Sequence, residues 1–173
     1  IKIKNQIIEP GIQAYSGKFT IAKESISTGT KSTVDKNYLD QRMAASFVLY
    51  PKPFGIQAEY NYGRGPEFNK LTDSIEVQKL HGGYITLSYF IPIKKEILMP
   101  FFRAQYFNGG KKHELDARSY EVKEFEIGVE WQPIKQFELT AMYTFSNRRF
   151  EDFALQDNQQ KGKLLRLQAQ INF

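Results

Sequence analysis

Apolar and polar residues alternate with a period of two along much of the chain. In "FELTAMYTF", every second residue from Phe137 to Phe145 is apolar or aromatic, and the residues between them are mostly polar. The same alternation recurs in "GIQAEYNYGR", "EFEIGVEW" and "FRAQY", and it continues through the terminal stretch "LRLQAQINF". Such a pattern is typical of strands with one apolar and one polar face, and no segment requires a helix.

The connections between these strands alternate in length. Tight connections with proline, such as "EPG" and "PKPFG", come between long polar stretches such as "KESISTGTKSTVDKN" and "GRGPEFNKLTDSIEV". Short turns on one side and long loops on the other are typical of an antiparallel up-and-down barrel of the outer membrane. The pattern predicts an all-β chain with strands near residues 1–8, 12–23, 38–50, 55–64, 78–91, 100–108, 119–132, 136–148 and 162–173.

Aromatic residues at both ends of the predicted strands favour a membrane barrel over a soluble one. Those beside the short turns are Tyr50, Phe54, Tyr89, Phe90, Phe101, Trp131, Phe137 and Phe173, and those toward the loops are Tyr62, Tyr106, Phe107, Tyr120 and Phe145. Two interfacial girdles would have this distribution. A soluble sandwich or lipocalin-like barrel also alternates, but it would not require aromatic residues at both ends of nearly every strand.

Composition narrows the class of protein further. The length of 173 residues fits one domain over 1–173. No apolar run reaches the roughly 18 residues of a membrane-spanning helix, which excludes a helical membrane protein but not a barrel. The formal charge is +5, with both signs mixed along the chain. Because the aromatic residues fall on the face opposite the strand cations, we expect no nucleic-acid groove.

The number of predicted strands bears on how much of a barrel is present. The terminal strand is predicted to end on the side of the short turns. With nine alternating strands, the first strand would then start on the loop side, and Ile1 would lie at the outer surface. Single-chain bacterial barrels have an even strand number, so we expect the C-terminal part of a larger barrel. If residues 1–8 are not a strand, eight strands remain, and a small complete barrel filled by side chains is the alternative.

Several strand-sized phrases point to a known family. The segments "GGYITLSYFIP", "PFFRAQYF", "FEIGVEWQPIKQFELTAMYTF" and the terminal strand resemble the C-terminal half of the phosphate-selective porin O/P family of Gram-negative bacteria. "PFGIQAEYNYGR" is similar to an earlier hairpin, so the resemblance covers residues 38–173. It implies a trimeric outer-membrane barrel of about sixteen strands with a basic lumen. The partners that it implies are the lipid bilayer, small solutes or anions, and two further copies of the chain.

Basic residues are the candidate solute contacts. The alternation predicts Lys18, Arg42, Arg103 and Arg166 on the polar face, with Arg64, Arg148 and Arg149 near the loop-side mouth. Lysine and arginine in a pore select anions, and arginine can hold phosphate through two hydrogen bonds. Pairing with acids to order the wall is the alternative, since the same face is predicted to carry Glu59, Glu124, Glu126, Glu130 and Glu138. Ion selectivity therefore stays open.

The sequence offers little for catalysis. Its only histidines are His81 and His113, it has no cysteine, and neither histidine has a nucleophile at a recognisable spacing. "YGRGPEF" lacks the lysine and hydroxyl of a P-loop and reads as a turn. We therefore expect no enzyme, no metal site and no cofactor. The favoured function is a passive channel for small hydrophilic solutes, and the alternative is a non-conducting structural or partner-binding barrel.

Overall fold

A computed structural model describes residues 1–3, 6–25, 30–69, 71–72, 74–111, 117–150 and 158–172. Among these residues the regular elements are all strands, and no helix is long and apolar enough to cross a membrane. The strands are β1 (Lys2–Ile3), β2 (Gln6–Ser25), β3 (Thr30–Leu49), β4 (Phe54–Asn69), β5 (Ser74–Tyr89), β6 (Ile91–Ile93), β7 (Glu96–Gly110), β8 (Ser119–Ile134), β9 (Phe137–Phe150) and β10 (Asn158–Ile171).

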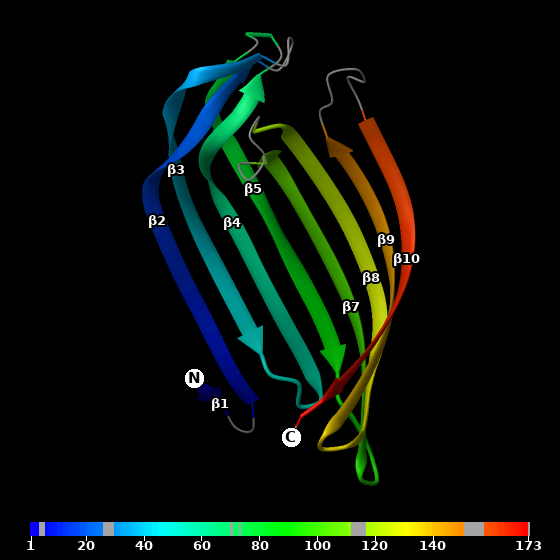
Figure 1. Cartoon of the computed structure of the whole chain (residues 1–173). Helices are drawn as coiled ribbons and strands as arrows, with labels where there is room; N and C mark the ends of the chain where they lie inside the picture. The colour runs from blue at the N-terminus through cyan, green and yellow to red at the C-terminus, as the bar shows by residue number, and fades with distance from the viewer. Residues whose placement is uncertain are drawn as a thin grey trace.

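The strands form one antiparallel sheet in which sequence neighbours are also spatial neighbours (Figure 1). Its order is β1-β2-β3-β4-β5-β7-β8-β9-β10, and the short β6 pairs with the start of β7. Each long strand alternates between two faces, which is the geometry that the period-two pattern requires. The predicted all-β, antiparallel, up-and-down architecture is therefore confirmed.

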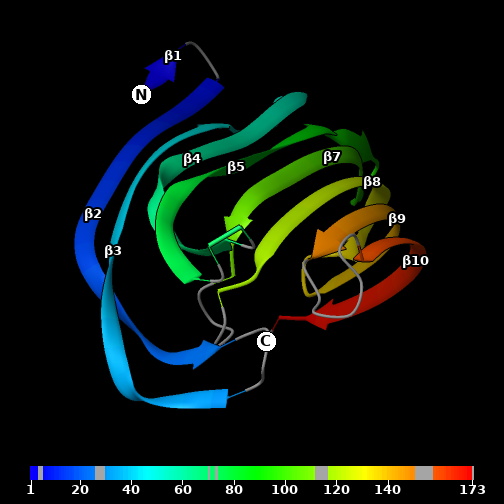
Figure 2. The same cartoon turned by 90° about the horizontal axis from the view of Figure 1, so that it is seen from above.

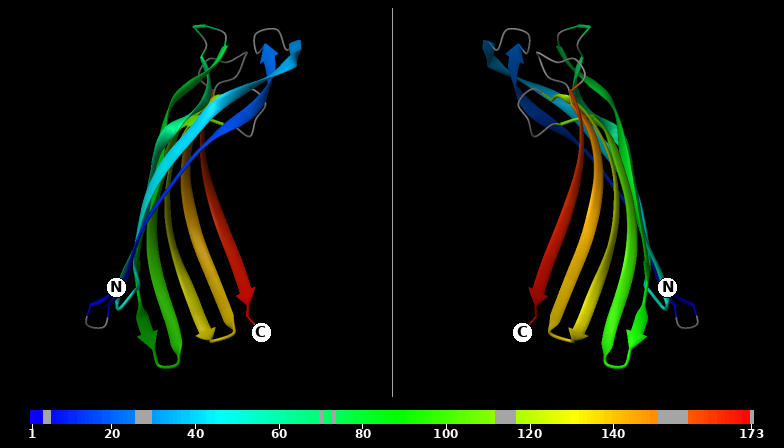
Figure 3. Two further views of the ribbon diagram at one scale, coloured as in Figure 1. Left: turned by 90° about the vertical axis from the view of Figure 1, so that its left-hand side faces the viewer. Right: turned by 90° about the vertical axis from the view of Figure 1, so that its right-hand side faces the viewer.

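The sheet is curved and open. Figure 2 shows the curvature across the whole width of the sheet, with β2 and β10 near its two edges. No register pair joins β2 to β10 among the described residues. Figure 3 shows both termini at the end that carries the short turns, such as 50–53 and 135–136. We call this the turn end, and the opposite end the loop end.

The prediction for the first strands was wrong. "EPG" is not a turn, because Glu9, Pro10 and Gly11 lie inside the continuous strand β2 and pair with β3. β1 folds back on β2 in a tight hairpin, so Ile1 lies at the turn end and not at the outer surface. Proline is tolerated near the edge of a sheet, since its missing donor need not interrupt a ladder. Eight long strands therefore replace the expected nine among the described residues.

The strands also extend further toward the loop end than the alternation predicts. β4 continues to Asn69 and β5 begins at Ser74, so most of the expected loop at 63–77 is paired backbone. Near this end of the sheet, a small apolar cluster forms around Ile21, Tyr38 and Ile75. Backbone pairing does not depend on which side chains alternate, so ladders can continue where the apolar pattern ends. The predicted contact of Phe173 at the interface lies outside the described residues.

Candidate functional site on the inner face

The two faces of the sheet differ sharply in exposure. On β8, Glu124 and Glu126 are 7% and 9% exposed, whereas Phe125 and Ile127 between them are 52% and 53% exposed. Side chains on the concave side of a curved sheet converge and shield one another, while those on the convex side diverge. We call the face with Glu124 and Glu126 the inner face, and the face with Phe125 and Ile127 the outer face. Polar groups thus gather inside and apolar groups outside.

A hydrogen-bonded cluster on the inner face is centred on Glu124. Its Oε1 atom accepts hydrogen bonds from Ser146 at 2.7 Å and from Arg148 Nη2 and Nε at 2.6 and 3.1 Å. Its Oε2 atom accepts a short hydrogen bond from Gln105. The four residues come from β7, β8 and β9, so the cluster ties three strands together. Arg148 is therefore committed to a carboxylate, as charge-assisted hydrogen bonds of this kind are the strong ones.

Arg103 on β7 is held less completely. Its Nη1 atom lies 4.0 Å from Glu126 Oε2, the limit of an ion pair, and its guanidinium lies over the Tyr84 ring at 4.8 Å from the centroid. Its Nε atom is buried and has no hydrogen-bond partner among the described residues. Glu126 accepts a hydrogen bond from Thr144 at 3.1 Å. The Arg103 side chain as a whole is 38% exposed, so part of its guanidinium group still faces the solvent on the inner side.

Arg42 on β3 lies beside an acidic residue of the same strand. Its Nε atom donates to Asp40 Oδ1 at 3.1 Å, and the other carboxylate oxygen of Asp40 accepts from the Tyr15 hydroxyl at 2.6 Å. Arg42 also lines a small hollow with Gln13, Tyr15 and Asn61. Its guanidinium is positioned by Asp40 and faces polar groups of β2 and β4.

Arg166 on β10 lines a second hollow that also contains Arg148, Glu124 and Glu126. In the register it lies opposite Met142, so it is on the inner face. Among the residues that the structure describes, it makes no ion pair. Arg103 and Arg166 are thus the inner-face arginines whose charge is least engaged by neighbouring carboxylates.

Three of the predicted site residues lie on the other face. The register pairs Lys18 with Leu39, Arg64 with Lys79 and Arg149 with Glu121. All three are on the outer face of their strands. The error for Lys18 has a physical cause. Near the loop end, Phe19 and Ile21 of β2 pack inward against Tyr38, so the apolar phase there marks the inner face.

Sequence reasoning missed two inner-face residues that contact the arginines. Tyr84 stacks with Arg103, and Gln105 completes the Glu124 cluster. Tyr84 lies at an even position of β5, whereas the apolar residues Ile85, Leu87 and Tyr89 lie at odd positions. This alternation could have identified Tyr84 as an aromatic residue of the inner face. Nothing in the sequence distinguishes Gln105 from the other polar residues of the face.

Charge is divided unequally between the faces. Acidic side chains outnumber basic ones on the inner face of the described strands, where the acids are Glu9, Asp40, Glu59, Glu67, Glu76, Glu124, Glu126, Glu130 and Glu138 and the bases are Lys36, Arg42, Arg103, Arg148 and Arg166. The described residues contain no cluster of histidine, aspartate or glutamate that could hold a metal ion. The chemistry that remains is reversible contact between polar solutes and a mixed wall with several arginines.

The comparisons with known proteins agree with this geometry. The family model described as phosphate-selective porin O and P matches residues 11–173. The matched range begins inside β2 and includes β3 to β10, so it extends well beyond the part in which the sequence phrases are recognisable. Neither the comparison with curated proteins nor the comparison with solved structures gave a match.

Proposed function

Because the chain belongs to the phosphate-selective porin O and P family, we propose that it forms one continuous wall segment of an outer-membrane channel. Small hydrophilic solutes diffuse through this channel passively, and anions such as phosphate are favoured at two arginines. The exposed apolar outer face contacts lipid, and the inner face lines the aqueous path. In this proposal the channel works without a catalytic group and without turnover.

The observation that carries the proposal is the unused capacity of Arg103 and Arg166. The Arg103 side chain is 38% exposed and lies only at the 4.0 Å limit of an ion pair with Glu126, and Arg166 makes no ion pair among the described residues. An anion that passes the inner face would compete with only one long ion pair at Arg103, and with none of the described carboxylates at Arg166. Guanidinium groups suit phosphate because their planar forks match two of its oxygens.

The other two inner-face arginines of the site support the wall. Arg148 is bound to Glu124 and Arg42 to Asp40, so their charges are largely compensated. The excess of acids on this face opposes a general attraction of anions. We therefore assign the anion preference to local contacts at Arg103 and Arg166, and not to the overall field of the wall.

Conductance of the natural full-length protein in planar bilayers tests the proposal. We expect open channels whose reversal potential in a chloride gradient leans toward anions. An anion about 4 Å from one charge in water gains about 1 kcal/mol, so removing such a charge lowers its local occupancy about fivefold. The variant Arg103→Ala/Arg166→Ala should thus reduce the anion-to-cation permeability ratio and weaken block of chloride current by phosphate.

A matched control removes the same number of positive charges from the outer face. Arg64→Ala/Lys79→Ala should leave the permeability ratio unchanged, because both residues lie outside the aqueous path. Equal effects of the inner and outer variants would contradict the assignment. A folded, membrane-inserted protein that conducts no ions would overturn the channel proposal and favour the non-conducting barrel.

A further inference from the structure

Two cations lie directly opposite each other on the outer face near the loop end. Arg64 on β4 and Lys79 on β5 are register partners, and both are exposed. Among the described residues, neither makes an ion pair. Like charges in directly opposed positions destabilise a pair of strands. Such a pair becomes favourable when an anion lies between the two side chains.

The pair is part of a wider asymmetry on the outer face. The basic strand residues of this face are Lys18, Arg64, Lys79, Lys123, Arg149, Lys161 and Lys163, and they all lie toward the loop end. The acidic ones among the described strand residues are Glu96 and Glu121, and Glu96 lies near the turn end. The loop-end margin of the apolar surface is therefore strongly cationic.

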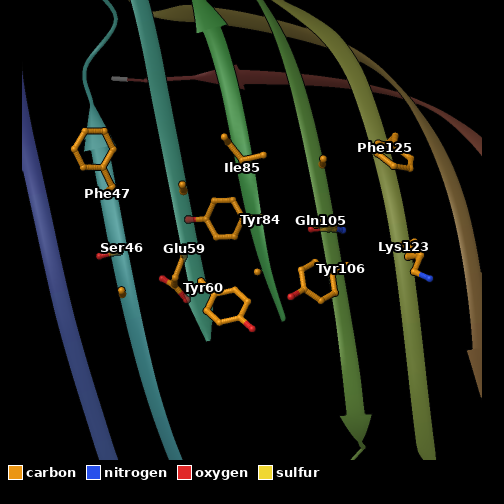
Figure 4. Close-up of a pocket in the computed structure, with 14 residues that line it drawn as sticks. Ser46, Phe47, Glu59, Tyr60, Tyr84, Ile85, Gln105, Tyr106, Lys123 and Phe125 are labelled. Atoms are coloured by element: carbon orange, nitrogen blue, oxygen red, sulfur yellow. The ribbon is translucent and has the colours of Figure 1, made fainter. Parts of the chain in front are cut away.

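A groove begins next to this cationic margin. It has a volume of about 620 Å³ and crosses β3, β4, β5, β7 and β8 on the outer face (Figure 4). Its floor is built from small residues, Ala45, Ala58, Gly83 and Ala104, and rings of Phe47, Tyr60, Tyr106 and Phe125 form its walls. Lys123 lies at one side of it.

The groove and the cation pair share two strands. Lys79 and Gly83 are four residues apart on β5, which corresponds to about 13 Å along an extended strand. Arg64 and Ala58 are six residues apart on β4, which corresponds to about 20 Å, and Tyr60 and Tyr62 lie between them on the same face. A molecule with a negative head and an apolar chain could therefore place its head between Arg64 and Lys79 while its chain lies in the groove.

We propose that this surface binds a phosphate-bearing lipid of the membrane leaflet on the loop side. The phosphate lies between Arg64 and Lys79, and one acyl chain lies along Ala58 and Gly83. The positive margin complements an anionic headgroup, and the continuous apolar groove distinguishes a lipid from a free anion. This inference rests on the membrane location of the chain but not on its conductance, so the two proposals can fail separately.

Native mass spectrometry of the natural full-length protein provides the test, with phosphatidic acid as the probe and phosphatidylcholine of the same acyl chains as the reference. Each basic residue near a membrane surface contributes about fivefold to the affinity for anionic lipid. We expect Arg64→Gln/Lys79→Gln to weaken phosphatidic acid binding by about 25-fold. The control Lys95→Gln/Lys135→Gln removes the same charge from exposed turns at the opposite end and should leave this binding unchanged.

A second variant tests the groove without touching the charges. Ala104→Phe fills part of the floor, and we expect it to weaken phosphatidic acid binding several-fold while the folded barrel is retained. Inorganic phosphate should compete poorly, since it lacks the acyl chain. The proposal is overturned if both charge variants bind phosphatidic acid equally, if inorganic phosphate displaces it completely, or if the groove proves to be covered by a second copy of the chain.

Discussion

The Glu124–Arg148 pair allows a quantitative test of how the inner face is held together. The two side chains differ in burial: the Glu124 side chain is 9% exposed, and that of Arg148 is 50% exposed. Removing the arginine leaves a buried carboxylate whose remaining partners, Gln105 and Ser146, are neutral. Neutralising the glutamate instead leaves a guanidinium that water can reach. The two substitutions should therefore have unequal costs.

The magnitude follows from the contacts. Arg148 donates two hydrogen bonds to Glu124 Oε1, and hydrogen bonds to charged groups contribute about 1.5–3 kcal/mol each when buried. Because Arg148 is half exposed, solvent screening reduces this contribution. We expect Arg148→Met to lower the free energy of unfolding by about 2 kcal/mol and Glu124→Gln to lower it by about 1 kcal/mol.

Urea unfolding of the full-length protein from lipid vesicles measures both changes, and the double variant isolates the coupling between the two residues. The matched control is Arg149→Met on the same strand. Arg149 lies 3.6 Å from Glu121, and both side chains are about 30% exposed, so this change should cost less than about 0.5 kcal/mol. The reasoning is refuted if Glu124→Gln costs more than Arg148→Met, or if Arg148→Met has no measurable effect.

Two further predictions concern packing and are checked by the same unfolding measurement. Leu80 is 2% exposed, so Leu80→Ala should cost about 2–4 kcal/mol, whereas Leu71→Ala at a 96% exposed position should cost less than about 0.5 kcal/mol. A Cβ atom on Gly63 would lie 3.0 Å from Arg42 Cα, so Gly63→Ala should cost about 1–3 kcal/mol. Gly17→Ala meets nothing within 4 Å and serves as its control. A small loss at Leu80, or equal losses at the two glycines, would contradict the packing that these contacts imply.

Much of the wall could be predicted because a membrane strand has a strict pattern. β7, β8 and β9 match the segments predicted from "FRAQY", "EFEIGVEW" and "FELTAMYTF", since each has one face toward lipid and one toward polar groups. The bounds of β2 were predicted incorrectly, because "EPG" has the composition of a turn. In the structure, Pro10 lies within a strand near the edge of the sheet. Turn propensity is local, whereas the position of a strand at the edge of a sheet is a tertiary property.

The assignment of faces failed where the strands pass beyond the apolar surface. Within that surface the apolar phase points outward, as in Phe125 and Ile127. Toward the loop end, Ile21 and Leu80 point inward and are 2% exposed, so the same periodicity has the opposite meaning. A single rule for phase therefore assigned Lys18 to the wrong face. Alternation alone shows which residues share a face of a strand. To decide whether that face points inward or outward, one must also know where along the strand the lipid-facing part ends.

This reversal also changes what the net charge of the chain means. From the formal charge of +5 alone, one would predict that the inner wall attracts anions in general. In the folded sheet, the outer face takes much of the basic excess of the described strands, and the inner face carries more acids than bases. An anion preference of such a wall must then depend on single donors such as Arg103, held by the Tyr84 ring and only weakly by Glu126. Hydrogen bonds act over a few ångströms, whereas salt screens the field of many charges over about 8–10 Å. Raising the salt concentration should therefore weaken attraction by the overall field far more than binding at single arginines.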